Sequence, residues 1–133
     1  MSETQQVSLQ ELVVLGAANP SLYYKTFFPR TCRMGFAPFH PEMDDLLEHP
    51  SARFVNLRAF RGSAKTSKLR MYITKRVAYR QSKTILYVGA SEGHAVRTIR
   101  WIKKQVELNK LWTSTFGLKK GSTWQDTLIE IIV

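Results

Sequence analysis

The sequence of 133 residues predicts an α/β fold in which about three strands form an incomplete parallel sheet flanked by helices. Three observations predict it. Residues 53–58 alternate between apolar and polar side chains, residues 84–89 form a continuous apolar run, and residues 69–80 between them carry apolar side chains at spacings of three and four. A strand, a helix and a second strand in this order make a parallel βαβ unit.

The residues before this unit are expected to be helical. Ser8 and Glu11 have the spacing of a capping box, which predicts a helix beginning at Leu9. An aromatic cluster precedes Pro29, and such a cluster is more typical of a core or a docking face than of a base-stacking platform. Its members are Tyr23, Tyr24, Phe27 and Phe28. We therefore assign residues 1–35 to an N-terminal helical segment.

Two further elements are expected after the second strand. Residues 92–109 carry an apolar stripe at helical spacing, preceded by Ser91 as a capping residue. The stripe consists of Ala95, Val96, Ile99, Ile102 and Val106. The apolar run over 127–133 predicts a strand that ends with the chain.

The segment between the first strand and its helix carries the candidate site. Lys65 and Thr66 stand at a helix start after small residues, where a phosphate-binding loop offers backbone N–H groups, a cation and a hydroxyl for Mg²⁺. The pattern G-x-x-x-x-G-K-[ST] is met imperfectly, because Ala59 and Ala64 occupy its two glycine positions and Gly62 lies between them. Two interpretations stay open: a phosphate loop, or a basic turn with a capping Ser or Thr.

The order of several motifs resembles the ATPase domain of the large terminase subunit of tailed phages, which packages DNA into proheads. The motifs are Phe39-His40-Pro41-Glu42-Met43, Asp45-Leu46-Leu47-Glu48 with Pro50, Arg61-Gly62-Ser63-Ala64-Lys65-Thr66, and Ile85-Leu86-Tyr87-Val88 with the following helix. The resemblance covers about residues 36–117, and Trp124 is also in keeping with it. It implies a parallel sheet of the P-loop NTPase type, with residues 36–133 as a partial P-loop ATPase domain that ends before the acidic, metal-binding strand end.

The same resemblance implies a nucleotide site with ATP and Mg²⁺ as cofactors. Lys65 would hold the β- and γ-phosphates, and Thr66 would ligate Mg²⁺ through its hydroxyl. Gly62, Ser63 and Ala64 would complete the loop around the phosphates.

Arginine and aromatic residues would complete this site. Arg58 or Arg61 would neutralise charge on the γ-phosphate, and Arg61 matches the arginine that this family's loops carry shortly before the lysine. We therefore assign Arg61 as the candidate catalytic residue, an arginine finger. Phe39 and His40 lie where this family contacts adenine. Core packing of Phe39 and a turn role for His40 before Pro41 stay open.

The catalytic acids of the family pattern are missing. An apolar strand ending in Asp and followed by an acidic residue is expected downstream of the loop. The acids after Lys65 are Glu92, Glu107, Asp126 and Glu130, and none is adjacent to another. The clustered carboxylates of a two-metal nuclease are absent as well. We therefore expect the front part of a packaging motor, with little or no ATP hydrolysis by this chain alone.

The charge is unevenly distributed along the chain. The formal net charge is +10, and residues 65–120 contain fourteen Lys and Arg against two Glu. Such a stretch favours a polyanion, and double-stranded DNA is the expected partner, held through phosphates without sequence preference. Arg97, Arg100 and Lys104 share one face of the predicted helix over 92–109. For each of these residues alone, a solvated helix face is the simpler interpretation.

The remaining expectations concern partners and compartment. The resemblance implies a phage or prophage protein in the cytoplasm of its bacterial host, acting with a portal and a small terminase subunit and oligomeric only at full length. A single cysteine, Cys32, rules out an internal disulfide and suits a reducing compartment. The apolar run over 12–18 is too short to span a membrane, and residues 1–6 lack the positive start of a signal peptide.

Two functions from different classes therefore remain open. In the first, the chain is the ATP-binding part of a terminase large subunit, with its phosphate loop at Arg58–Thr66. In the second, it is a basic DNA-binding or scaffold remnant whose loop is vestigial. A P-loop helicase or kinase of another family is a weaker third interpretation.

Overall fold

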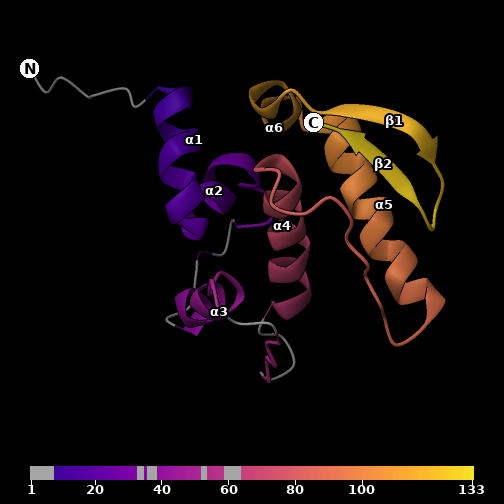
Figure 1. Ribbon diagram of the computed structural model, residues 1–133, viewed down its shortest axis with the longest axis horizontal. Coiled ribbons are helices and arrows are strands. Elements are labelled where there is room, and N and C mark those ends of the chain that lie inside the picture. Colours follow the sequence, from indigo (N-terminus) through magenta and orange to yellow (C-terminus); the bar gives the residue numbers. More distant parts are fainter. Residues whose placement is uncertain (1–7, 33–34, 36–38, 52–53, 59–63) are drawn as a thin grey trace, which may run out of the picture. The chain divides into compact units, whose positions relative to one another are not determined.

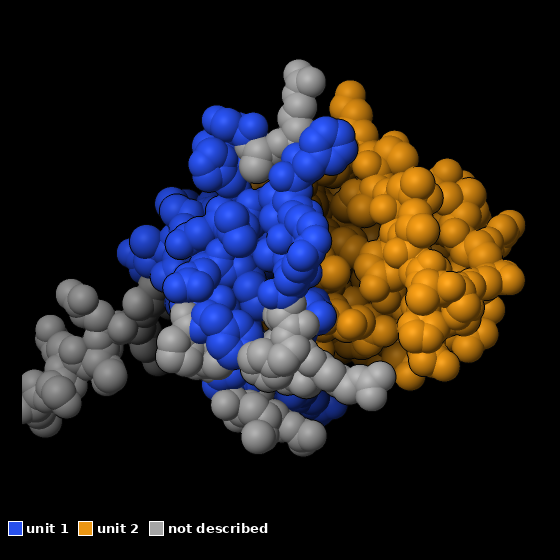
Figure 2. Space-filling model, turned by 90° about the horizontal axis from the view of Figure 1, so that it is seen from below, with its two compact units in different colours: residues 1–65 blue, residues 66–133 orange. Residues whose placement is uncertain are grey.

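The computed structural model describes residues 8–32, 35, 39–51, 54–58 and 64–133. These residues form helices α1 to α6 and strands β1 and β2 (Figure 1). The chain divides into two compact units, residues 1–65 and residues 66–133, which Figure 2 colours separately.

The first unit contains α1 (Leu9–Ala18), α2 (Pro20–Phe27) and α3 (Phe39–Leu47). The predicted capping box at the start of α1 is confirmed, because the Ser8 N–H donates to Glu11 Oε2 at 2.8 Å and the Glu11 N–H donates to Ser8 Oγ at 3.2 Å. Asn19 ends α1 and caps α2, where its Oδ1 accepts the Leu22 N–H at 3.2 Å. This shared cap joins two helices that pack on each other.

The aromatic cluster of α2 is buried, which confirms its prediction as a core element. Tyr23, Tyr24, Phe27 and Phe28 are all almost completely inaccessible to solvent. The Tyr23 ring lies 5.2 Å from that of Phe27 and 5.7 Å from that of Tyr24, in tilted and edge-to-face arrangements that aromatic pairs favour. These side chains are therefore occupied by packing and are not available for stacking on bases.

The second unit contains all of α4 (Lys65–Ala78) except its first residue, and then α5 (Glu92–Leu108), α6 (Lys110–Phe116), β1 (Lys119–Trp124) and β2 (Ile129–Ile132). The predicted helix over 92–109 is confirmed, with Ser91 as its cap: Ser91 Oγ accepts the His94 N–H at 3.4 Å. Thr98, Ile102 and Val106 form the buried side of α5.

The two strands form an antiparallel hairpin beside α5 (Figure 1). Lys119 pairs with Ile132 and Trp124 pairs with Ile129, with an irregularity between Lys120 and Trp124. Gly121 lies in this irregular part, where a Cβ atom would be 2.6 Å from the Cβ of Glu130. Only glycine allows the two backbones to approach so closely.

The predicted parallel sheet is wrong. Helices account for 57% of the described residues, and their strands form a two-stranded antiparallel sheet without any parallel pairing. The fold is therefore not of the P-loop NTPase type in the described residues. Neither residues 54–58 nor the predicted strand over 84–89 adopt strand structure. Only the last expected strand is found, as β2, and it pairs with a strand that was not predicted.

The apolar run over 84–89 shows the physical reason for this error. A strand that is buried on both faces needs neighbours on each side, yet the side chains of Leu86 and Val88 are 86% and 79% exposed. An apolar run indicates that burying the segment would be energetically favourable. Whether the segment pairs as a strand is decided by other parts of the chain. The hairpin partner of β2, Lys119–Trp124, contains two lysines and a glycine and has no apolar alternation.

We predict that Gly121→Ala destabilises the hairpin unit by about 1–3 kcal/mol, because the new methyl group meets the Glu130 backbone and Cβ. Urea unfolding followed by circular dichroism measures this change. Gly93→Ala is the matched control, because a Cβ at this position in the first turn of α5 meets nothing closer than 3.9 Å. The control should be neutral or slightly stabilising. Equal stability of the two variants would contradict the assigned register.

Candidate nucleic-acid interface

Two residues of the predicted phosphate site, Lys65 and Thr66, lie at the start of α4. Lys65 is the first residue of α4, as the sequence predicts, and Thr66 follows it with an exposed side chain. Ala64, which occupies the second glycine position of the loop pattern, has φ +64°. This left-handed conformation is uncommon for alanine and is the one that glycine adopts readily. Arg61, Gly62 and Ser63 lie outside the described residues.

The remaining residues of the predicted nucleotide site lie in the first unit. Phe39 and His40 form the first turn of α3, with ring centroids 4.4 Å apart. Phe39 is half-buried and His40 is buried, so both take part in packing. Arg58 is exposed in a segment without regular secondary structure. The adenine contact assigned to Phe39 and His40 stays a prediction.

No group of three or more His, Cys, Asp and Glu side chains gathers among the described residues in a way that could hold a metal ion. The Mg²⁺ contact assigned to Thr66 therefore stays a prediction that rests on one hydroxyl. None of the described helices is both long enough and apolar enough to cross a membrane.

Helix α5 displays cations on the side opposite its buried stripe. Arg97, Arg100 and Lys104 are exposed, whereas Ile102 and Val106 are buried. Spacings of three and four residues place the three cations on one face of the helix. Among the described residues, Arg97 and Lys104 have no ion-pair partner. Their charges are available to a ligand in solution.

The hairpin turn engages the neighbouring cations of α5. Arg100 Nη2 lies 3.1 Å from Asp126 Oδ2, and Lys103 Nζ lies 3.5 Å from Asp126 Oδ1 and 3.4 Å from the Gln125 carbonyl oxygen. Both partners of the Arg100–Asp126 pair are more than half exposed, so the pair contributes little to stability. Sequence reasoning missed this contact because the turn between β1 and β2 was not predicted.

Trp124 extends the cationic surface from α5 onto the hairpin. Its indole N–H donates to Glu107 Oε1 at 2.9 Å, which holds the ring beside α5. Lys120 Nζ lies 5.1 Å and Lys103 Nζ lies 5.9 Å from the ring centroid, within the range of cation–π attraction. Trp124 thus lies beside two ammonium groups, of which that of Lys120 is exposed and that of Lys103 is bound to Asp126 and to the Gln125 carbonyl.

The second unit carries many exposed lysine and arginine side chains, which we call the exposed cation set. Residues 66–133 contain thirteen Lys and Arg against four acids, whereas residues 1–65 contain seven against six. Two of the thirteen, Lys68 and Lys75, are buried and do not contribute to the surface. The exposed cation set is Arg80, Lys83, Arg97, Arg100, Lys104, Lys110, Lys119 and Lys120. Such a set attracts phosphates by charge, without reading bases.

Comparisons with known proteins give no relative for this chain. No protein-family model, curated protein or solved structure matches it.

We predict that Asp126 has a pKa below the usual value of about 3.9 for an aspartate, and that Arg100→Gln raises it. The hydrogen bond from Arg100 is the largest cause of the lowered pKa, followed by its charge, with Lys103 contributing. Because folding lowers the pKa of Asp126, the stabilisation that its carboxylate gains from Arg100 is fully present above the unfolded pKa. This stabilisation is lost as pH falls through the folded pKa.

An NMR titration of the Asp126 carboxyl carbon measures this pKa directly. Lys110→Gln is the control, because it removes one charge from the same unit at the start of α6. The Asp126 pKa should stay lowered in this control. An Asp126 pKa that is the same in wild type and Arg100→Gln would contradict the assignment.

Proposed function

We propose that this chain is a DNA-contacting part of a phage DNA-packaging terminase large subunit. The single observation that carries the DNA contact is the face of α5 on which Arg97 and Lys104 are exposed without ion-pair partners among the described residues. The family rests only on the order of the motifs around Phe39, Arg61–Thr66 and Ile85, and the parallel sheet that the resemblance implies is not found in the described residues. In this proposal the protein works in the cytoplasm of a bacterial host, with a portal and a small terminase subunit as partners.

The charge distribution supports contact with the phosphate backbone of a duplex. A rigid helix presents its cations at fixed spacing, and each cation that neutralises a phosphate releases a bound counterion. Lys120, which is exposed beside Trp124, enlarges the surface over which phosphates are attracted. Contacts of this kind carry no sequence information. Sequence-independent binding suits a motor that moves along any DNA.

A second candidate function is binding of ATP phosphates at the start of α4. The specific observation that favours it is Ala64 in a left-handed conformation directly before Lys65 and Thr66. The N-terminus of a helix of this length favours anions through its free N–H groups and its dipole. The fold of the described residues does not contribute a parallel sheet to this site, so the proposal is limited to phosphate binding and excludes hydrolysis.

We predict that Arg97→Glu combined with Lys104→Glu weakens binding to a short fluorescent DNA duplex by about tenfold or more at low salt. Because each lost phosphate contact makes the negative slope of log K against log salt shallower by about 0.9, the slope should become about 1.8 less negative. Fluorescence anisotropy over a salt series measures both quantities. Two duplexes of unrelated sequence should bind wild type equally.

Lys25→Glu combined with Arg30→Glu is the matched control, since it makes the same charge change in the first unit. This control should keep most of the affinity and the slope. An equal loss in both double variants would mean that net charge alone attracts DNA. The assignment of the α5 face would then be wrong.

We predict that wild type binds a fluorescent ATP analogue with Mg²⁺ saturably and that Lys65→Ala abolishes this binding, because the mobile cation beside the phosphates is lost. Lys110→Ala is the matched control, since Lys110 is also the first residue of a helix. It should bind like wild type. Equal binding of the ATP analogue by all three proteins, or no binding by wild type, would contradict a phosphate site at the start of α4. Steady Mg²⁺-dependent turnover of ATP would contradict the exclusion of hydrolysis.

A further inference from the structure

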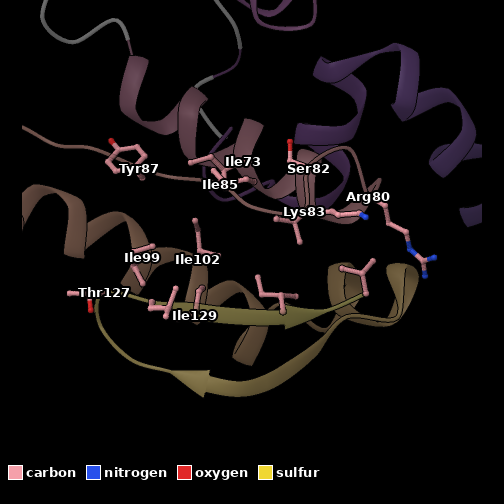
Figure 3. A pocket seen from close by; sticks show the side chains of 14 residues that line it. Ile73, Arg80, Ser82, Lys83, Ile85, Tyr87, Ile99, Ile102, Thr127 and Ile129 are labelled. Carbon is pink, nitrogen blue, oxygen red and sulfur yellow. The ribbon is translucent and has the colours of Figure 1, made fainter.

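The second unit contains a cavity of about 500 Å³ that the DNA contact does not use. Its walls come from α4, from the segment after α4, from α5 and from the hairpin, represented by Ile73, Ile85, Ile102 and Ile129 (Figure 3). Small-molecule sites have volumes of roughly 300–1,000 Å³. The cavity therefore has the size of a ligand site and lies inside one unit.

The cavity has an apolar interior and a cationic end. Ile99 and Ile102 of α5 lie opposite Ile85 in Figure 3, and Arg80, Ser82 and Lys83 lie together at one end of the view. None of the fourteen lining residues is acidic. Arg80 and Lys83 are exposed to solvent, and their positive charges attract an anionic group to this end.

The hydroxyl at this end is already engaged. Arg76 Nε and Nη2 donate to Ser82 Oγ at 3.0 and 2.8 Å, and Nη2 also donates to the Gln81 carbonyl oxygen at 3.3 Å. Arg76 thereby adds a third positive charge behind Ser82. Arg80 and Lys83 are exposed and keep their charges available to a ligand. Electrostatics at this end therefore favours an anion over a neutral polar group.

We propose that this cavity binds one acyl chain of an anionic amphiphile. Its hydrocarbon chain lies between the isoleucines of Figure 3, and its anionic headgroup lies beside Arg80 and Lys83. The shared chemistry is an acyl chain with a negative head, supplied either by a free fatty acid or by an anionic phospholipid. The proposal does not rest on the DNA contact assigned to α5, because neither Arg97 nor Lys104 lines the cavity, although Arg80 and Lys83 belong to the exposed cation set.

Calorimetric titration of the purified chain with dodecanoate, below the concentration at which it forms micelles, tests the proposal. We expect saturable binding at one site. Each methylene added between octanoate and dodecanoate should raise the affinity by about three- to fourfold, as burial of hydrocarbon requires. Dodecanol should bind less tightly than dodecanoate. Equal affinity for octanoate and dodecanoate, or no binding of dodecanoate, would overturn the proposal.

Two pairs of variants locate the site. Lys83→Glu should lower the affinity for dodecanoate about two- to fivefold and leave the affinity for dodecanol unchanged. Lys110→Glu makes the same charge change outside the cavity and should alter neither affinity. Ile85→Asp should weaken both ligands about tenfold or more. Leu86→Asp is its control, because Leu86 is the next residue and does not line the cavity. Equal effects within either pair would overturn the assignment, and circular dichroism checks that each variant is folded.

Vesicles of phosphatidylglycerol distinguish the two sources of the ligand. Binding of dodecanoate together with Lys83-dependent and Ile85-dependent binding of vesicles indicates a phospholipid, while dodecanoate binding without vesicle binding indicates a free fatty acid. Both results support the cavity. Vesicle binding that Ile85→Asp leaves intact, in a chain that does not bind dodecanoate, would show adsorption by surface cations and overturn the proposal.

Discussion

The second unit depends on packing of the hairpin against α5. Two antiparallel strands alone are at best marginally stable in water and require a further strand or a helix to lie against. Helix α5 supplies this support through its buried side, which includes Ile102 and Val106. At the edge of the hairpin Trp124 donates a hydrogen bond to Glu107 and Asp126 pairs with Arg100, and this exposed ion pair itself adds little stability. The cavity and the exposed cations are both consequences of this arrangement.

The same helix serves two purposes through its two sides. Its buried side holds the unit together, and its exposed side carries the charges that we assign to DNA. Because a helix in a packed unit cannot rotate without exposing its apolar stripe, the positions of Arg97 and Lys104 are set by Thr98, Ile102 and Val106. Stability and binding are therefore linked through the register of a single helix.

Local signals of the sequence predicted local structure well. The capping box of Ser8 and Glu11 and the cap of α5 at Ser91 are decided by residues within one turn, and both are observed. The sheet is different, because pairing joins β2 to a strand that shows no apolar alternation. An apolar run such as residues 84–89 indicates a tendency to be buried and does not identify a partner.

Prediction of the candidate site has the same limit. Helical spacing was sufficient to place Arg97, Arg100 and Lys104 on one face, and the structure exposes them there. Burial of Lys68 and Lys75, and the pairing of Arg100 with Asp126, depend on tertiary contacts that no spacing reveals. Charge counted along the sequence therefore overstates the charge available at the surface. The cavity was not predicted, since its walls come from four separate parts of the chain.

Uneven charge has a kinetic consequence. Of the net charge of +10, nearly all belongs to residues 66–133, and the first unit is close to neutral. A molecule with this asymmetry feels a torque in the field of a polyanion and turns its charged unit forward while it is still diffusing. A larger fraction of collisions then begins in a productive orientation. Electrostatic orientation before contact thus raises the association rate at low ionic strength, and screening beyond roughly 10 Å at about 0.1 M salt removes most of the benefit.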